Sequence, residues 1–231
     1  MTDGVFARRA VVGFGASAAV TGLAGSARSE PARASAGAEG VWRPTFEPQD
    51  SWLDRAGARH RLVLDAASAA AAASAVFFAD NFYLANRTAY GLPSDSLGVV
   101  IILRHFATPY GYDDGVWAKY GSLLAATLGL TGAAAAAAAH VNPGNLAGPK
   151  VKPTDDEVTL ATLAKKGAMF AICGLATEYL GGVISAKTGQ KPEAVAAELK
   201  GRLIPGGINV PAGIVAVNRA QEHGYAYVAV A

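Results

Sequence analysis

The sequence predicts a three-layer α/β/α sandwich around a five-stranded, mostly parallel sheet. First, the composition, 52% hydrophobic and 16% charged over 231 residues, is typical of one globular α/β domain with additional terminal segments. Second, β-type runs alternate with helical stretches along the chain. Third, the unbroken apolar run Val99 to Leu103 lacks the polar alternation of a half-exposed strand. Such a run favours a parallel strand that is covered on both faces.

Short β-type runs predict the five strands, at residues 60–66, 97–105, 168–173, 208–213 and 225–231. Between them, helical spacing or good helix formers predict helices at 67–88, 115–128, 158–167, 175–188, 191–203 and 213–224. The seven alanines at 133–139 indicate a brief helix, and a loop rich in Pro, Gly and Asn follows them. Right-handed crossovers would place all strand-to-helix loops at one edge of the sheet.

The first 38 residues have the layout of an export signal. Arg8-Arg9 precede a modestly apolar run over 10–24, and A-x-A cleavage options follow at 32–34 and 36–38. Adjacent arginines indicate the twin-arginine route and therefore a periplasmic location. The alternative is a single membrane anchor, but about 15 apolar residues fall short of the roughly 20 needed to span a bilayer. Residues 39–59 are then an extended lead-in, and 60–231 form the folded domain.

The charge distribution argues against nucleic-acid binding. The chain has 20 basic and 18 acidic residues, and the first 34 residues supply the whole excess. The rest shows no basic stripe interleaved with aromatic residues. It also has no P-loop, no G-x-S-x-G, no dinucleotide fingerprint after a strand, and no Cys or His pair at metal-ligand spacing. No cofactor, no metal and, once the signal is removed, no membrane span are therefore expected.

Parallel strands deliver their carboxyl ends to one edge of the sheet, where the ligand or reaction site lies. The first three strands and the loops after them bring to this edge Asp65, Arg104, His105, Tyr110, Tyr112, Cys173 and Gly174, and the fourth strand brings Pro211 and Gly213. In contrast, the three other histidines are expected to be polar surface or loop residues: His60, His140 and His223.

Cys173 is the only cysteine of the chain. In an oxidising compartment a lone cysteine cannot form an internal disulfide. It is expected at the end of the third strand, just before a helix whose first amides favour thiolate over thiol. Free cysteine is also among the most commonly buried residue types, so the local sequence leaves a reactive thiol and a core residue both open.

The stretches "MFAICGLATEYLGGVI" and "LIPGGINVPAGIVAVNRAQEHGYAYV" resemble the carboxyl half of DsrE/DsrF-like proteins, specifically their exported, twin-arginine branch. "HRLVLDA", "LGVVIILRHFATPYGYDDGVWAKYG" and Asn142-Pro143 resemble the same branch, so the resemblance covers most of residues 60–231. It implies a five-stranded, largely parallel α/β/α fold of flavodoxin-like topology and assembly into homotrimers or homohexamers. It also implies that Cys173 carries sulfur as a persulfide, exchanged with a donor or acceptor protein.

Two functional hypotheses follow. In the first, the protein handles sulfur in the periplasm: Cys173 accepts sulfane sulfur and passes it on, and His105 and Arg104 stabilise the thiolate or an incoming anion. In the second, it is a non-catalytic binding or assembly module in which Cys173 is packed between sheet and helix. Its small-molecule pocket or oligomer face is then lined by Tyr110, Tyr112 and Trp117. A pocket that reaches the sulfur favours the first hypothesis, and full burial favours the second.

Overall fold

The computed structural model of the chain describes residues 43–146 and 157–231. The export signal expected over residues 1–38 therefore lies outside the described residues. Among the helices of the described ranges, none combines the length and the apolar character that crossing a membrane requires.

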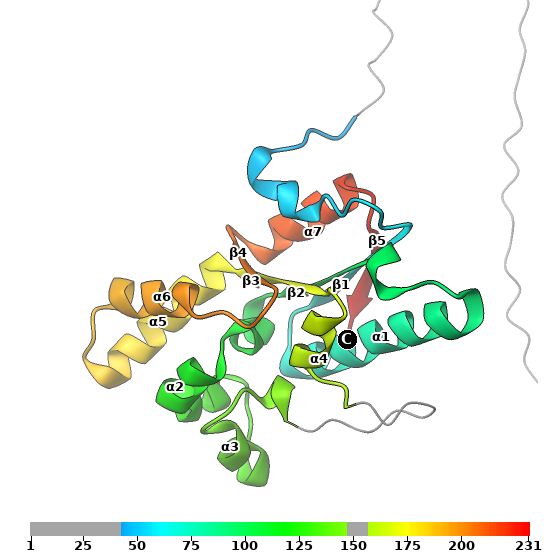
Figure 1. Cartoon of the computed structure of the whole chain (residues 1–231). Helices are drawn as coiled ribbons and strands as arrows, with labels where there is room; N and C mark the ends of the chain where they lie inside the picture. The colour runs from blue at the N-terminus through cyan, green and yellow to red at the C-terminus, as the bar shows by residue number, and fades with distance from the viewer. Residues whose placement is uncertain (1–42, 147–156) are drawn as a thin grey trace, which may run out of the picture. The chain divides into compact units, whose positions relative to one another are not determined.

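Five parallel strands form one sheet in the order β4-β3-β2-β1-β5 (Figure 1). Their bounds are His60–Ala66 for β1, Leu97–Leu103 for β2, Met169–Cys173 for β3, Gly207–Val210 for β4 and Ala226–Val230 for β5. Every residue of β2 is buried, as its unbroken apolar run predicted. The expected sandwich is confirmed, and all neighbouring strands of the sheet are parallel.

Seven α-helices are present in the described ranges: α1 Ala69–Tyr90, α2 Asp114–Thr127, α3 Gly132–Ala138, α4 Leu160–Lys165, α5 Gly174–Thr188, α6 Pro192–Gly201 and α7 Gly213–Glu222. Two 3-10 helices matter for the site, η1 Pro48–Leu53 in the lead-in and η3 His105–Gly111 after β2. Local sequence explains several helix ends. The Ser68 side chain caps α1 by accepting a hydrogen bond from the Ala71 amide, and left-handed Gly91 and Gly189 end α1 and α5.

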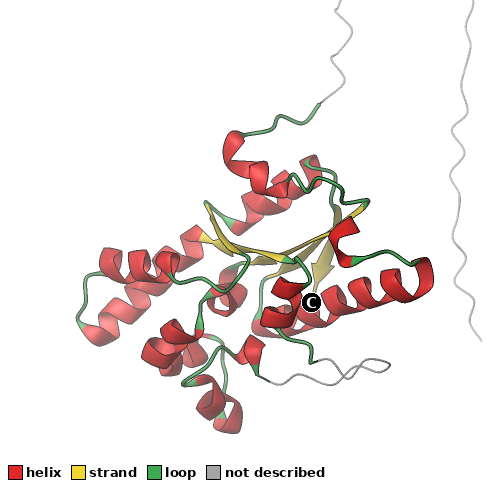
Figure 2. Cartoon of the chain, viewed as in Figure 1, coloured by secondary structure: helices red, strands yellow, loops and turns green. Residues whose placement is uncertain are grey.

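The two faces of the sheet carry two separate cores, with helices on both sides (Figure 2). Leu64, Ile101 and their equivalents in β3 belong to the core that α1, α2, α4, α5 and α6 cover. The alternate residues, among them Val63 and Val100, pack against α7 and η1. We call this second side the α7 face. Successive side chains of a strand point to opposite faces of the sheet, so alternate residues of each strand belong to the two different cores.

The strand order explains why α7 lies alone with η1. From β1 to β4 the chain moves across the sheet in one direction, so right-handed crossovers place their helices on one face. Only the step from β4 to β5 goes back, which puts α7 on the opposite face. In the flavodoxin strand order, 2-1-3-4-5, the chain reverses its direction across the sheet after the second strand. The strand order of this sheet therefore differs from the flavodoxin order. Here the loops after adjacent β3 and β4 leave toward opposite faces, and open α/β sheets bind ligands at such a point.

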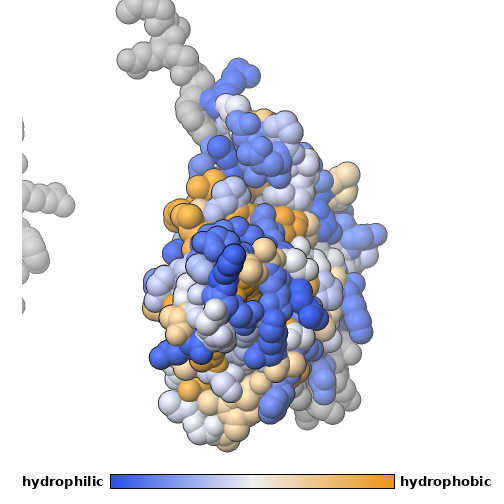
Figure 3. Space-filling view, turned by 90° about the vertical axis from the view of Figure 1, so that its left-hand side faces the viewer, coloured by the Kyte–Doolittle hydropathy of each residue, from blue (hydrophilic) through white to orange (hydrophobic). Residues whose placement is uncertain are grey.

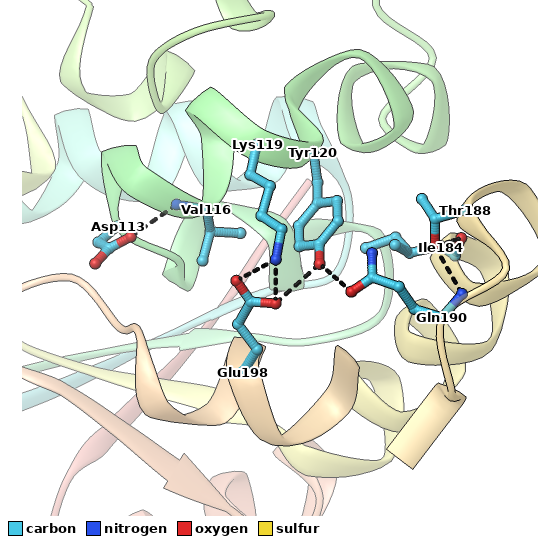
Figure 4. A network of polar contacts seen from close by, with 8 residues as sticks. All are labelled: Asp113, Val116, Lys119, Tyr120, Ile184, Thr188, Gln190 and Glu198. Carbon is cyan, nitrogen blue, oxygen red and sulfur yellow. Dashed lines mark hydrogen bonds and ion pairs between the residues drawn. The ribbon is translucent and has the colours of Figure 1, made fainter. Parts of the chain in front are cut away.

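A polar network joins α2 to the α5–α6 pair (Figure 4). The carboxylate of Glu198 in α6 accepts hydrogen bonds from Lys119 Nζ at 2.7 and 2.8 Å and from the Tyr120 hydroxyl at 2.8 Å. The Tyr120 hydroxyl also lies 3.2 Å from Oε1 of Gln190. The hydrogen bonds from Lys119 and, less strongly, from Tyr120 hold the pKa of Glu198 below its usual value. Their contribution to stability is therefore present above the ordinary carboxyl pKa and is lost as the pH falls through the lowered one.

Replacing Tyr120 by Phe is expected to lower the free energy of unfolding by about 1 kcal/mol, because a ring only 3% exposed loses its hydroxyl–carboxylate hydrogen bond. Tyr90→Phe is the matched control, since Tyr90 is 75% exposed, and no change is expected there. Urea denaturation of both variants measures the difference. The effect of Tyr120→Phe should shrink once the pH falls below about 4.3, where an unperturbed Glu takes up its proton. Equal effects of the two substitutions would contradict this role of the network.

Candidate functional site

Cys173 ends β3 and directly precedes α5, where the sequence predicted it. It retains 8% of its surface exposed and lines a cavity of about 540 Å³. The other lining residues come from the loop after β2, from α2, and from the beginnings of α5 and α7. The Thr177 hydroxyl donates a hydrogen bond to the Cys173 carbonyl at 3.0 Å and so fixes the first turn of α5. Cys173 is thus largely buried, yet an open cavity reaches it.

Strand register brings Arg104 beside Cys173. Leu103 is paired with Ile172, so the residues that follow them in β2 and β3 lie next to each other at the carboxyl edge. Alternation along the strands then directs both side chains to the α7 face, because Leu103 and Ile172 belong to the opposite core. Asp65 precedes Ala66, another residue of that opposite core, and shares the α7 face with them. Three polar or sulfur-bearing side chains therefore meet at one edge of one face.

Arg104 and Asp65 form a two-pronged ion pair. Nε and Nη2 of Arg104 donate hydrogen bonds to the two carboxylate oxygens of Asp65 at 2.7 and 3.0 Å. The Tyr227 hydroxyl of β5 donates a third one, to Oδ2 at 3.2 Å. The Asp65 hydrogen bond raises the pKa of Arg104 further, and negative charge on nearby Cys173 acts in the same direction. Sequence reasoning missed Tyr227, although the alternation in "YAYV" places it on one face of the last strand.

His105 follows the end of β2 in an unusual backbone conformation. Its φ of 54° makes it the single non-glycine residue of the described ranges in the left-handed region. The strand therefore ends at Leu103, two residues earlier than expected, and His105 opens η3. Its ring packs on Phe106 with centroids 4.0 Å apart, and both residues line the cavity with Arg104 and Cys173. The structure thus brings together three of the predicted site residues.

Three aromatic residues that the sequence placed at a possible pocket, Tyr110, Tyr112 and Trp117, do not line this cavity. Tyr112 and Trp117 are fully buried in the core opposite the α7 face. The Tyr112 hydroxyl lies 2.8 Å from that of Thr177, and Trp117 Nε1 donates to the Pro109 carbonyl at 3.2 Å. Burial raises the pKa of Tyr112 well above its usual value. Tyr110, also buried, borders a separate hollow beside α1.

Two glycines allow α5 and α7 to begin close together. A Cβ on Gly174 would lie 2.8 Å from the Val210 carbonyl oxygen and 3.0 Å from that of Pro211. A Cβ on Gly213 would lie 2.5 Å from Cβ of Arg104. Gly174 therefore shapes the cavity by permitting close approach and does not itself line it. Asp65 likewise lies outside the lining and acts through Arg104.

The cavity has apolar walls that sequence reasoning missed. Four large side chains of the lining are 45–68% exposed, namely Phe106, Leu175, Tyr179 and Ile214. Leu175 and Ile214 lie in the first turns of α5 and α7, Tyr179 lies further along α5, and Phe106 lies in η3. In Figure 3, which views the molecule from the α5–α6 side, hydrophobic surface in orange lies beside a strongly hydrophilic end. Exposed apolar side chains that gather around one hollow indicate a binding surface.

His223 is buried, which corrects its expected place on the surface. Its Nδ1 lies 2.8 Å from Oδ1 of Asp54, and its ring packs edge-on against Phe46 at 4.5 Å between centroids. Both partners belong to the lead-in, so the histidine anchors that segment beside the end of α7. It does not contribute to the lining around Cys173.

Within residues 43–146 and 157–231, no group of three or more His, Cys, Asp or Glu side chains is placed to hold a metal ion. Comparison of the chain with protein-family models, with curated proteins and with solved structures found no match.

Replacing Gly174 by Ala is expected to lower the free energy of unfolding by about 1–3 kcal/mol, because the added methyl group meets two backbone carbonyl oxygens that cannot rotate away. Gly182→Ala in the same helix is the matched control. A Cβ there has open space, and alanine is the better helix former by up to about 1 kcal/mol. Thermal or urea unfolding of both variants measures the contrast. A Gly174→Ala protein as stable as Gly182→Ala would show that the two helix starts are not held in close contact.

Proposed function

We propose that the protein is a periplasmic sulfur carrier of the DsrE type, in which Cys173 holds the transferred sulfur as a persulfide. The observation that carries the proposal is the cavity that reaches Cys173 at the crevice between β3 and β4. This is the position where open α/β sheets place their ligand sites. The resemblance in the sequence assigns the same cysteine, which gives the proposal a second and separate support.

The electrostatic surroundings suit a thiolate. α5 and α7 both begin without a side-chain cap, and the first residues of both helices line the cavity. The Leu175 amide in the first turn of α5 donates to the Pro211 carbonyl at 3.2 Å. The partial positive charge of the two helix starts favours thiolate over thiol. The guanidinium of Arg104, which directly follows β2, shares its charge with the Asp65 carboxylate and adds less positive potential than the helix starts. In this arrangement Arg104 and His105 line the cavity beside the sulfur, and the helix starts supply most of the stabilisation of negative charge.

The transfer step balances without an added oxidant. The Cys173 thiolate attacks the terminal sulfur of a persulfide donor R–S–SH. A sulfur–sulfur bond forms between Cys173 and that terminal sulfur while the sulfur–sulfur bond of the donor breaks, and its electron pair leaves with R–S⁻. The products are Cys173–S–SH and the donor thiolate, and an acceptor thiolate removes the sulfur in the same way.

The experiment is intact-mass analysis of the purified full chain, with and without denaturant. Cys173 is expected to react with iodoacetamide in the folded protein and to gain one sulfur atom on exposure to polysulfide, which a reducing agent then removes. With a single cysteine in the chain, Cys173→Ser is a complete control and should show neither change. Labelling only after denaturation would make Cys173 a core residue and would leave the alternative, a non-catalytic binding or assembly module.

The resemblance also leads us to propose export by the twin-arginine route, a sulfur donor or acceptor protein as partner, and assembly into a homotrimer or homohexamer. Strand β5 supports assembly, because it is an edge strand with no charged residue and no proline. Its Tyr227 and Val228 side chains are about two-fifths exposed. Natural proteins usually protect such an edge with charges, proline or a covering element.

Val228→Lys is expected to weaken the assembly, since a charge on an edge strand opposes pairing with another chain. Light scattering of the full chain before and after the substitution gives the mass of the particle. Lys187→Gln, a surface change near the end of α5, serves as control and should leave the mass unchanged. A monomer in the unsubstituted protein would overturn the proposed assembly.

A further inference from the structure

The walls around Cys173 differ in chemistry from its immediate surroundings. Phe106, Leu175, Tyr179 and Ile214 present apolar surface to the cavity, and Ala176 and Ala212 continue it. At about 540 Å³, the cavity is in the range that holds a small organic molecule. A bare sulfide or a short inorganic sulfur anion would leave most of these walls exposed to water.

The one permanently charged side chain of the lining is already neutralised. Arg104 is held by both oxygens of Asp65, whose side chain is 3% exposed. Tyr227 supplies a further hydrogen bond to the same carboxylate. The pair as a whole has no net charge, so it offers little attraction to a ligand that is itself an anion in solution. Positive potential is left mainly at the helix starts beside the sulfur, where charge develops during transfer.

We propose that the sulfur donor of this site is an apolar organic persulfide, whose organic group fills the cavity while its terminal sulfur meets Cys173. The inference rests on the proposed sulfur transfer and adds the substrate class to it. The apolar walls take up the organic group, and burying it provides binding free energy in proportion to the apolar area removed from water. The uncapped starts of α5 and α7 lie where the Cys173 thiolate and the departing R–S⁻ carry negative charge. An inorganic polysulfide would interact with the helix starts but would not fill the space between the apolar walls.

The test compares benzyl persulfide with inorganic polysulfide on the full chain, at equal concentrations of transferable sulfur. Each rate of mass gain at Cys173 is divided by the rate measured for the chain unfolded in urea, which removes the difference in intrinsic reactivity. The folded protein is expected to favour benzyl persulfide by at least tenfold. A double substitution of the walls, Leu175→Ser with Ile214→Ser, should lower the normalised rate with benzyl persulfide far more than the rate with polysulfide and so remove most of that preference. Leu146→Ser, an exposed apolar residue of the separate hollow beside α1, is the control and should change neither rate.

The outcomes separate this inference from the function on which it rests. Sulfur transfer from both donors without a preference for benzyl persulfide would overturn the substrate class and leave the carrier intact. Transfer from neither donor would overturn the carrier. In that case, calorimetric titration of the Cys173→Ser chain with benzyl methyl sulfide still tests whether the cavity binds an apolar ligand, because binding needs no reaction. Binding that the Leu175→Ser, Ile214→Ser double variant abolishes would support the apolar site, and no binding would overturn it.

Discussion

The Asp65 carboxylate is nearly removed from water at the carboxyl edge of the sheet, and the site depends on how its charge is satisfied. A buried carboxylate without partners is strongly unfavourable, and Arg104 and Tyr227 supply three hydrogen bonds to it. Because Asp65 and Tyr227 belong to β1 and β5 and Arg104 directly follows β2, these hydrogen bonds tie three adjacent strands together at this edge. It also fixes the carbon chain of Arg104, against which the first turn of α7 rests through Gly213. Loss of either charged partner would therefore disturb the cavity as well as the sheet.

Topology determines that this edge opens beside Cys173 and not elsewhere. The chain reverses its direction across the sheet only after β4, so β3 and β4 send their following helices to opposite faces. α5 and α7 begin close together above the ends of these strands and then run on opposite faces of the sheet. The hollow lies beside their first turns, and Cys173 forms part of its lining. A cysteine at the end of β1 would face a different environment, because β1 contributes Asp65 to the ion pair and has no reversal of the chain beside it.

The parts of the structure that sequence predicted are those determined by local pattern. The buried run of β2, the strand-to-helix junction at Cys173 and the glycine that follows it all follow from neighbouring residues. The errors concern polar and aromatic side chains whose burial depends on partners far along the chain. Tyr112 is buried because Thr177 meets its hydroxyl, and His223 because Asp54 meets its ring nitrogen. The cavity walls were missed for a related reason, since exposed apolar residues on two separate helices gather only when the topology brings those helices together.

The same geometry limits what can reach the sulfur. Cys173 is 8% exposed at the base of a cavity whose rim carries Leu175, Tyr179 and Ile214. A hollow of about 540 Å³ has room for a small organic molecule beside Cys173. A protein acceptor would have to present its thiol on a narrow, extended segment. Under the proposed export, the same restriction would protect the lone cysteine from disulfide formation with other chains, because thiol–disulfide exchange requires direct attack on an accessible sulfur. Partial burial of Cys173 is therefore compatible with the proposed reactivity, and in that role the shape of the cavity would select the reaction partners.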